Sequence, residues 1–372
     1  MNKFLTLAFM MKGSEGGEGV KTLPCFFVYY QCLPEKAFFC YSFRMSQTKK
    51  QILLSGIQAT GKPHIGNYFG AMKQFVDLQD SYQSHIFIAD LHALNTVQNK
   101  DQLRQNIIDI ALDYLAIGLD PKKTLIYKQS DIPEHAELAW IFETITTMPY
   151  LMRAHAYKDA EEKGKEISVG TFNYPMLMAA DILLYDADVV PVGQDQKQHL
   201  EITRDTARKF NGVFGQTFKE PKELILENVS VVPGIDGRKM SKSYSNTIPL
   251  FADNETIKKA VMSIPTDSKG IDEKKDIHKD TVFALHKLFT SGSEYENIRD
   301  KYINGGIGYK ESKEVLIKNI TQFIEPLREK RDKLKHETNT VLDILKEGGL
   351  KARALAATKM DTVREKIGVK LY

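Results

Sequence analysis

Short apolar runs of strand type alternate with longer helical segments through the first part of the chain, and this alternation constrains the fold most. The strand-like runs lie at 52–57, 86–89, 124–128 and 189–192. The helical patterns that follow them lie at 65–79, 101–117, from Pro133 onward and 194–210. Strands that alternate with helices favour a parallel sheet with helices on both faces. The sequence therefore predicts an α/β, doubly wound, Rossmann-like domain whose ligands bind at the carboxyl ends of the strands.

Beyond about residue 248 the strand-like runs stop and helical patterns take over. These patterns lie at 254–263, 280–290, 311–324 and 326–346. Breaks are expected at Gly305-Gly306 and Gly348-Gly349. A chain of 372 residues is long enough for two domains. We therefore predict a Rossmann-like catalytic domain at 45–247 and an all-helical domain at 248–372.

Residues 1–44 differ from the rest in composition. They hold all three cysteines of the chain, Cys25, Cys32 and Cys40. The remaining chain therefore has neither a disulfide frame nor a cysteine zinc site, which fits a reducing cytoplasm. We expect residues 1–44 to be an atypical, disordered extension and Met45 to be the working start.

Charge and hydropathy exclude some classes of function. Net charge is only +3, so bulk charge gives little support for a nucleic-acid partner. Basic runs at 328–335 and 351–370 contain acidic residues as well, and solvated helix faces explain them equally well. No apolar run approaches the roughly 20 residues of a spanning helix, so no membrane span is expected.

A glycine-rich turn joins the first strand-like run to the first helix. It reads S-G-I-Q-A-T-G-K-P-H-I-G-N-Y over 55–68. Pro63 suits a helix start, where its missing N–H costs nothing. Free N–H groups at a helix N-terminus bind anions, so this layout predicts a phosphate site. The turn also matches G-x-x-x-x-G-K, but Pro63 stands where a P-loop needs a magnesium-binding hydroxyl, and we reject that reading.

The stretch K-M-S-K-S at 239–243 carries two lysines three residues apart. Gly234 and Gly237 precede it, and Ser245 and Asn246 follow, a composition typical of a mobile loop. Two ammonium groups on a loop that closes suit a polyphosphate leaving group. A solvated basic loop is the ordinary alternative, but the phosphate-type turn far upstream favours a binding role.

These two elements together resemble the paired signatures of the class I aminoacyl-tRNA synthetases, H-I-G-N at 64–67 and K-M-S-K-S at 239–243. The first signature departs from the usual H-I-G-H, because Asn67 can donate a hydrogen bond to phosphate but cannot carry charge. Three further segments are similar to the bacterial-type tryptophanyl-tRNA synthetases. They are S-G-I-Q at 55–58, N-Y-P-M-L-M-A-A-D-I-L-L-Y at 173–185 and G-Q-D-Q-K-Q-H at 193–199. The resemblance runs from about residue 50 to the C-terminus.

The resemblance implies an ATP site. In it Gly66 lets the adenine lie against the backbone, Asp195 accepts ribose hydroxyls, and Val231 gives backbone contacts. Simple helix capping is the alternative for Asp195. The implied catalytic residues are Lys239, Lys242, His64 and Asn67. The implied ATP contacts are Gln58, Ala59, Thr60, Gly66, Asn67, Gly193, Gln194, Asp195, Val231, Lys239, Met240, Ser241, Lys242 and Ser243.

An amino-acid pocket is expected around one helix. Tyr174, Met178 and Asp181 are spaced i, i+4 and i+7, so they form one stripe. From this window alone Asp181 is an ion-pair or helix-end aspartate, because a buried carboxylate needs partners. The resemblance implies instead that Asp181 accepts the indole N–H of tryptophan, an acceptor that phenylalanine would leave unpaired. The implied tryptophan contacts are Asp181, Met178, Tyr174, Gln196, His92 and Gly56, with a plain loop histidine as the alternative for His92.

The implied activity is a tryptophan–tRNA ligase. The tryptophan carboxylate attacks the α-phosphate of ATP, pyrophosphate leaves, and a terminal ribose hydroxyl of tRNA(Trp) takes the tryptophanyl group. A carboxylate is already a good nucleophile, so catalysis is mostly positioning and charge stabilisation, shared by the two lysines and by Mg²⁺ that arrives with ATP. The resemblance also implies a cytoplasmic homodimer, whose helical domain meets the tRNA anticodon, and no metal site of the protein's own.

Three alternatives stay open at this point. Tyrosyl-tRNA synthetases share the fold and variant forms of both signatures. A smaller nucleotidyltransferase could carry a similar turn, but the complete K-M-S-K-S and the helical C-terminal half argue against it. A non-catalytic paralogue could bind tRNA or tryptophan as a regulator, although both lysines and the pocket aspartate are intact.

Overall fold

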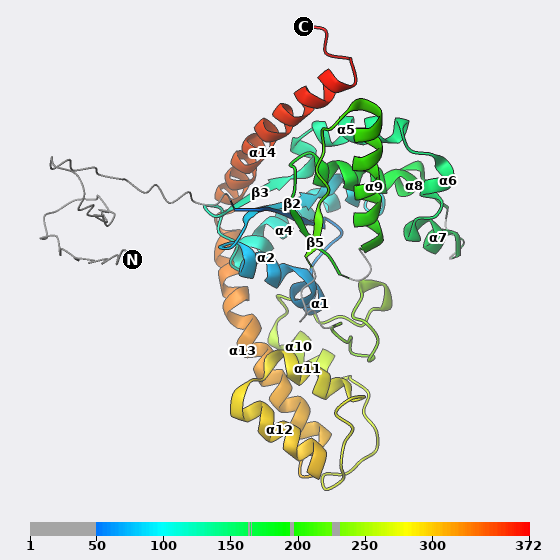
Figure 1. Ribbon diagram of the computed structural model, residues 1–372. Helices are drawn as coiled ribbons and strands as arrows, with labels where there is room; N and C mark the ends of the chain where they lie inside the picture. The colour runs from blue at the N-terminus through cyan, green and yellow to red at the C-terminus, as the bar shows by residue number, and fades with distance from the viewer. Residues whose placement is uncertain (1–49, 163, 165, 194–196, 225–230) are drawn as a thin grey trace, which may run out of the picture. The chain divides into compact units, whose positions relative to one another are not determined.

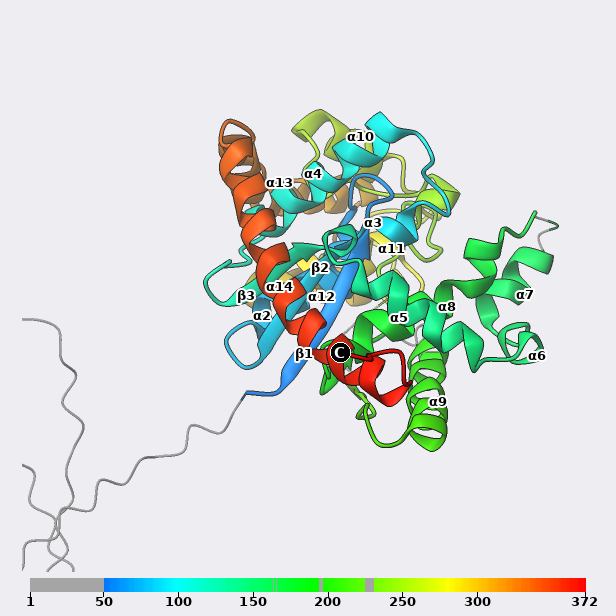
Figure 2. The same ribbon diagram turned by 90° about the horizontal axis from the view of Figure 1, so that it is seen from above.

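A five-stranded parallel sheet forms the centre of the fold. The computed structural model describes residues 50–372 apart from 163, 165, 194–196 and 225–230, so the predictions for residues 1–44 and Met45 lie outside the described residues. The strands are β1 (Ile52–Gln58), β2 (Gln83–Ala89), β3 (Thr124–Lys128), β4 (Val189–Pro191) and β5 (Lys222–Leu224). Their order is β3-β2-β1-β4-β5, and every neighbouring pair is parallel. This confirms the α/β, Rossmann-like prediction, whereas the short edge strand β5 was not predicted (Figures 1 and 2).

Helices connect the strands and cover the sheet. We call the K-M-S-K-S stretch at 239–243 the lysine loop. The helices before it are α1 (Ile65–Asn67), the π-helical turn η1 (Tyr68–Met72), α2 (Lys73–Leu78), α3 (Asp90–Ala93), α4 (Lys100–Ala116), the 3-10 turn η2 (Gln129–Asp131), α5 (Glu134–Thr144), α6 (Met148–Leu151), α7 (His155–Glu162), α8 (Val169–Leu183) and α9 (Lys197–Phe214). None of the described helices is long and apolar enough to cross a membrane.

Two apolar cores lie on opposite faces of the sheet. Alternate residues of a strand point to opposite faces, so Leu53 joins the core with α2 and α4, and Leu54 joins the core with α5 and α8. Ile86 and Phe87 of β2 divide in the same way. Because both faces are covered, the strands read as continuous apolar runs instead of alternating ones.

The C-terminal helices agree with the prediction at 254–263 and 280–290 and differ from it after residue 290. They are the 3-10 turn η4 (Lys242–Tyr244), α10 (Asn254–Met262), α11 (Thr281–Phe289), α12 (Gly292–Asn304), α13 (Tyr309–Lys335) and α14 (Thr338–Lys366). The predicted boundary between 311–324 and 326–346 is wrong, because α13 runs through Pro326. Proline removes one backbone hydrogen bond. Ile324 before it and Leu327 after it both pack in apolar cores, and this packing keeps the helix continuous.

Glycine pairs end one helix and lie inside another. Gly305 has φ +90° and follows the end of α12, which confirms the first predicted break. The second predicted break is wrong, because Gly348 and Gly349 lie inside α14. A Cβ on Gly348 would stand 1.8 Å from the carbonyl oxygen of Ile126 in β3, so glycine is required where α14 contacts the strand. The last helix therefore packs on the sheet, and the domain boundary at 247/248 stays a prediction.

The apolar residues next to Trp140 in the sequence predict a core position for it, but this prediction is wrong, because Trp140 lies on the surface. Leu138, Ile141 and Phe142 form the buried face of α5, whereas Trp140 on the opposite face is 66% exposed. Helical spacing i, i+3 and i+4 separates the two faces.

Candidate active site

Loops that carry the predicted site residues gather at the carboxyl ends of β1, β2 and β3. The glycine-rich turn continues past the end of β1 at Gln58, α3 with His92 follows β2, and η2 begins directly after β3. These ends lie together because the three strands are parallel neighbours. The sheet therefore brings the predicted phosphate turn and the predicted amino-acid pocket to one edge.

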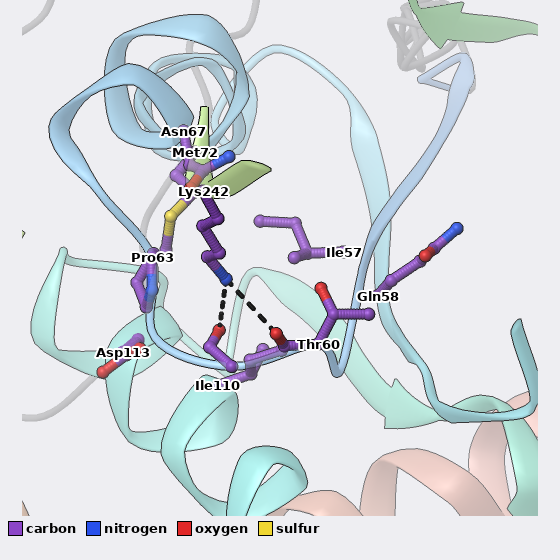
Figure 3. A pocket seen from close by; sticks show the side chains of 10 residues that line it. Ile57, Gln58, Thr60, Pro63, Asn67, Met72, Ile110, Asp113 and Lys242 are labelled. Carbon is purple, nitrogen blue, oxygen red and sulfur yellow. Dashed lines mark hydrogen bonds between the residues drawn. The ribbon is translucent and has the colours of Figure 1, made fainter. Parts of the chain in front are cut away.

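A cavity of about 210 Å³ opens above the glycine-rich turn (Figure 3). Four of the residues expected to contact ATP line it, together with the side chains of helix α4. The lining is Ile57, Gln58, Thr60, Gly61, Pro63, Asn67, Met72, Ile110, Asp113 and Lys242. The structure thus places the fourth residue of the H-I-G-N turn and the second lysine of K-M-S-K-S around one space.

Lys242 is the direct link between the two signatures. Its Nζ donates hydrogen bonds to the carbonyl oxygens of Gly61 at 3.0 Å and Thr60 at 3.5 Å (Figure 3). Burial lowers the pKa of Lys242, and the carboxylate of Asp113 partly opposes that shift. When an anion enters the cavity, the Lys242 ammonium group can exchange these two carbonyl partners for phosphate oxygens.

Two further contacts join the turn to the lysine loop and to the segment that follows it. The Ile65 N–H donates to the carbonyl of Ile248 at 2.9 Å, and Met240 is buried with its sulfur 3.4 Å from the Gly66 nitrogen. A Cβ on Gly66 would lie 3.2 Å from the Met240 Cβ and 2.9 Å from His64 Nδ1. Glycine is therefore required for this close packing, and the predicted contact with adenine remains a prediction.

His64 and Asn67 form a reciprocal cap at the start of α1. The His64 N–H donates to Asn67 Oδ1 at 3.0 Å, and the Asn67 N–H donates to His64 Nδ1 at 3.3 Å. Burial, with help from the charge of Lys242, lowers the pKa of His64 to about 4. The imidazole is therefore neutral at pH 7, with its proton on Nε2, and Asn67 keeps its amide N–H groups as donors. Both side chains can offer uncharged N–H groups to an anion.

Asn246 holds the lysine loop in shape and was not predicted to do so. Its buried amide nitrogen donates to the carbonyl of Lys239 at 3.1 Å and to Asp236 Oδ1 at 2.7 Å. Its Oδ1 accepts from the Ser241 N–H at 2.8 Å. A Cβ on Gly234 would lie 2.3 Å from this amide, which explains the glycine. Lys239 is exposed and lies outside the lining of the cavity.

Asp181 sits at the centre of a buried polar cluster on α8. It is 1% exposed, and Oδ2 lies 3.0 Å from His92 Nε2. Oδ1 accepts from Gln129 Nε2 at 2.7 Å and lies 2.6 Å from His135 Nδ1. Burial raises the pKa of Asp181, but His135 and His92 together outweigh it and lower the pKa below its usual value. The carboxylate therefore stays ionised at neutral pH as an acceptor.

The predicted stripe on α8 is present, and most of its residues already have partners. Tyr174 and Met178 are half-buried on the same helix as Asp181. The Tyr174 hydroxyl is hydrogen-bonded to His199 Nε2, and its ring stands edge-on to His92 at 6.0 Å between centroids. The resemblance implies that Tyr174 binds the amino group of tryptophan, and it can do so only if it shares its hydroxyl with His199.

The other predicted residues are placed as follows. A Cβ on Gly56 would lie 2.7 Å from the carbonyl oxygen of Phe87, so this glycine serves strand packing. Ala59 is buried, and its carbonyl accepts from Asn106 at 2.9 Å. Gly193 and Val231 are exposed. Ser241 Oγ accepts a hydrogen bond from the Ser243 N–H at 3.3 Å. The remaining three, Gln194, Asp195 and Gln196, lie outside the described residues.

A buried ion pair joins the wall of the cavity to α13. Arg331 Nε is hydrogen-bonded to Asp113 Oδ1, and its Nη2 donates to Asp109 Oδ1 at 2.7 Å. Asp113 is fully buried, and burial raises its pKa to about 6 although Arg331 acts in the opposite direction. The sequence gives no local signal for this pair, because its partners are 218 residues apart.

Comparison with known proteins agrees with the geometry. The family described as tRNA synthetases class I (W and Y) matches residues 46–325. The tryptophan–tRNA ligase of Fusobacterium nucleatum subsp. nucleatum is 49% identical over 85% of this chain and 97% of its own length. That of Rhodopirellula baltica is 48% identical over 86% of this chain and 99% of its own length.

A solved structure gives the same result for the fold. Tryptophanyl-tRNA synthetase from Campylobacter jejuni, complexed with ADP and tryptophan, is 44% identical, with a TM-score of 0.80 over 86% of this chain and 100% of its own. The resemblance seen in the two signatures and in the 173–185 helix is thereby confirmed. The chain belongs to the tryptophan–tRNA ligase family of class I aminoacyl-tRNA synthetases.

Proposed function

We propose that this chain activates tryptophan with ATP, releases pyrophosphate, and transfers the tryptophanyl group to tRNA(Trp). The observation that carries the proposal is the contact of Lys242 Nζ with the carbonyl of Gly61 at 3.0 Å. It brings the lysine loop onto the turn whose helix N-terminus is suited to phosphate. The relative from Campylobacter jejuni, solved with ADP and tryptophan, supports the same pair of substrates.

The charge on the departing pyrophosphate is met by cations that the loop delivers. Lys242 exchanges its carbonyl partners for phosphate oxygens, and Lys239 joins it from the same loop. Neutral His64 and Asn67 add N–H donors from the turn, where they are held by their reciprocal cap. These groups act on charge that develops in the transition state, where preorganised donors lower a barrier most.

Tryptophan is recognised by the carboxylate of Asp181. Its Oδ2 accepts from His92 at 3.0 Å and can take a second donor, since a carboxylate oxygen accepts more than one hydrogen bond. The indole N–H is that second donor. Phenylalanine leaves the acceptor unpaired, and a tyrosine hydroxyl lies in another place, so both are rejected.

Magnesium enters with ATP, because Mg²⁺ in such sites is held largely by phosphate oxygens and water. In the described part of the chain no group of three or more histidine, cysteine or carboxylate side chains is placed to hold a metal. When bound with ATP, magnesium offsets the charge of the triphosphate.

The tRNA is proposed to meet the helices after residue 248 with its anticodon. The family resemblance supports this, as it supports a cytoplasmic homodimer. Trp140 in α5, Met148 in α6 and Met152 directly after α6 are exposed by 66%, 67% and 43%, and they are candidates for such a contact. Large exposed apolar side chains of this kind mark interaction sites.

Exchange between ATP and labelled pyrophosphate tests the proposal. With tryptophan present, the purified chain should exchange label, and with tyrosine or phenylalanine at equal concentration it should not. Exchange that tyrosine supports and tryptophan does not would show that the chain activates tyrosine, the other amino acid in the description of its family. Absence of exchange with every amino acid would favour a non-catalytic binder.

A further inference from the structure

Gln129 is a buried glutamine that touches two parts of the proposed amino-acid pocket. It opens η2 directly after β3 and is fully buried. Its Nε2 donates to Asp181 Oδ1 at 2.7 Å. Its Oε1 accepts from the backbone N–H groups of Leu91 at 3.2 Å and His92 at 3.4 Å. One side chain thus connects η2, α8 and the first turn of α3.

The direction of this amide is fixed by chemistry. An ionised carboxylate can only accept hydrogen bonds, so Asp181 must face the NH₂ group of Gln129. Backbone N–H groups can only donate, so Leu91 and His92 must face its oxygen. A flipped amide would place oxygen against carboxylate and NH₂ against N–H. Gln129 therefore has one orientation that satisfies all its partners.

The cluster needs a side chain that donates to the carboxylate at one end and accepts from backbone N–H groups at the other. His92 reaches Asp181 Oδ2 at 3.0 Å through its ring, and its backbone is held by Gln129. His135 lies 2.6 Å from Oδ1 through its Nδ1 and is hydrogen-bonded to the Tyr185 hydroxyl through its Nε2, so both of its ring nitrogens face partners outside α3. Gln129 is thus the side chain that fixes both the carboxylate and the histidine beside it.

We propose that Gln129 is a positioning residue that sets the preference for an amino acid whose ring bears an N–H. It holds Asp181 so that Oδ2 points at the ring nitrogen, and it holds α3 so that His92 occupies one side of that oxygen. The inference rests on the proposed role of Asp181. Supporting groups of this kind commonly change affinity about 10-fold when removed.

The test compares two substrates in the pyrophosphate-exchange assay, tryptophan and 3-(benzothiophen-3-yl)alanine, in which sulfur replaces the ring N–H. Wild-type protein should prefer tryptophan. In Gln129→Met, which keeps the volume but has no amide, the KM for tryptophan should rise about 10-fold. The KM for the sulfur analogue should change much less, and the KM for ATP should stay the same. The ratio of kcat/KM between the two substrates should therefore fall.

Gln79→Met is the matched control. Gln79 is also buried, and its amide donates to the Gly118 carbonyl at 3.2 Å and accepts from the Asp120 N–H at 2.9 Å, before β2 and away from Asp181. It should leave the substrate ratio unchanged even if it lowers stability. Gln129→Asn, whose shorter amide cannot span both partners, should lower the ratio as Gln129→Met does and serves if the methionine variant is insoluble.

The outcomes separate the two levels of the argument. An unchanged substrate ratio in either soluble Gln129 variant would overturn the positioning role. A wild-type protein that uses both substrates equally would overturn the proposed role of Asp181 itself, and this inference with it. A lower ratio in a Gln129 variant, with Gln79→Met unchanged, supports the proposal.

Discussion

Arg331→Met should destabilise the protein by an amount that depends on pH in a predictable way. Arg331 on α13 is hydrogen-bonded to the fully buried carboxylate of Asp113 and to Asp109. Methionine keeps most of the apolar stem, so the change removes charge and hydrogen bonds and little packing. The size of the effect then depends on the free-energy cost of leaving the Asp113 carboxylate buried without its partner.

The cost is limited because the carboxyl can take up a proton. Burial already raises the pKa of Asp113 to about 6 in the presence of Arg331. At pH 7.5 protonation therefore costs about 2 kcal/mol relative to the present folded state. Loss of the hydrogen bond to Asp109 adds about 1–2 kcal/mol. We expect a total loss of about 3–4 kcal/mol at pH 7.5, falling to about 1–2 kcal/mol at pH 6, where protonation costs almost nothing.

Urea unfolding at pH 7.5 and pH 6.0 measures this loss. Lys335→Met, on the same helix but in an exposed pair with Asp332, is the control and should change stability by less than about 0.5 kcal/mol at both pH values. A loss for Arg331→Met that is the same at pH 7.5 and pH 6.0 would refute the reasoning, since it would show that Asp113 does not titrate in this range.

Three further predictions concern packing, acid stability and the amino-acid pocket. Gly348→Ala should lose about 3 kcal/mol or fail to fold, because the new Cβ would overlap the Ile126 carbonyl of β3, whereas Gly212→Ala has open space and should not be destabilised. The free energy of unfolding should fall by about 4 kcal/mol between pH 7.5 and pH 5. Burial lowers the pKa of His64, His85 and His286 to about 4 in the folded state, whereas the same histidines take up a proton near pH 6.5 when the chain is unfolded. The raised pKa of Asp113 opposes this loss only in part. The stabilising contribution of the three histidines is present above pH 6.5 and is lost as the pH falls toward 4; urea unfolding at a series of pH values measures it, and a flat profile would contradict it. Asp181→Ala should weaken tryptophan binding at least 10-fold in equilibrium dialysis and leave ATP binding intact, and equal loss of both would indicate a folding role.

Local sequence patterns were sufficient for four of the five strands and for both signatures, but not for the short edge strand β5. The strands of the centre, the turn after β1 and the i, i+4, i+7 stripe on α8 each follow from residues close together in the chain. The exposed Trp140 could also have been predicted, because Leu138, Ile141 and Phe142 already define the buried face of α5. The error there came from reading neighbours in sequence instead of neighbours on a helix.

Contacts between distant segments explain what the sequence did not reveal. A proline or a pair of glycines usually ends a helix. Pro326 and Gly348 nevertheless lie inside helices that tertiary packing keeps continuous. The pairs Gln129 with Asp181 and Arg331 with Asp113 join residues 52 and 218 positions apart, and no local pattern marks them. A buried polar residue has no sequence signal until its partner is known.

The central claim is that the lysine loop and the glycine-rich turn act on one triphosphate, and pyrophosphate exchange by Lys242→Ala tests it most directly. Removing Lys242 should lower kcat for tryptophan-dependent exchange by about 100-fold or more, with the KM for tryptophan nearly unchanged. Lys73→Ala, in an exposed pair with Asp77 on α2, should behave as wild type. Exchange by Lys242→Ala at the wild-type rate would contradict the account.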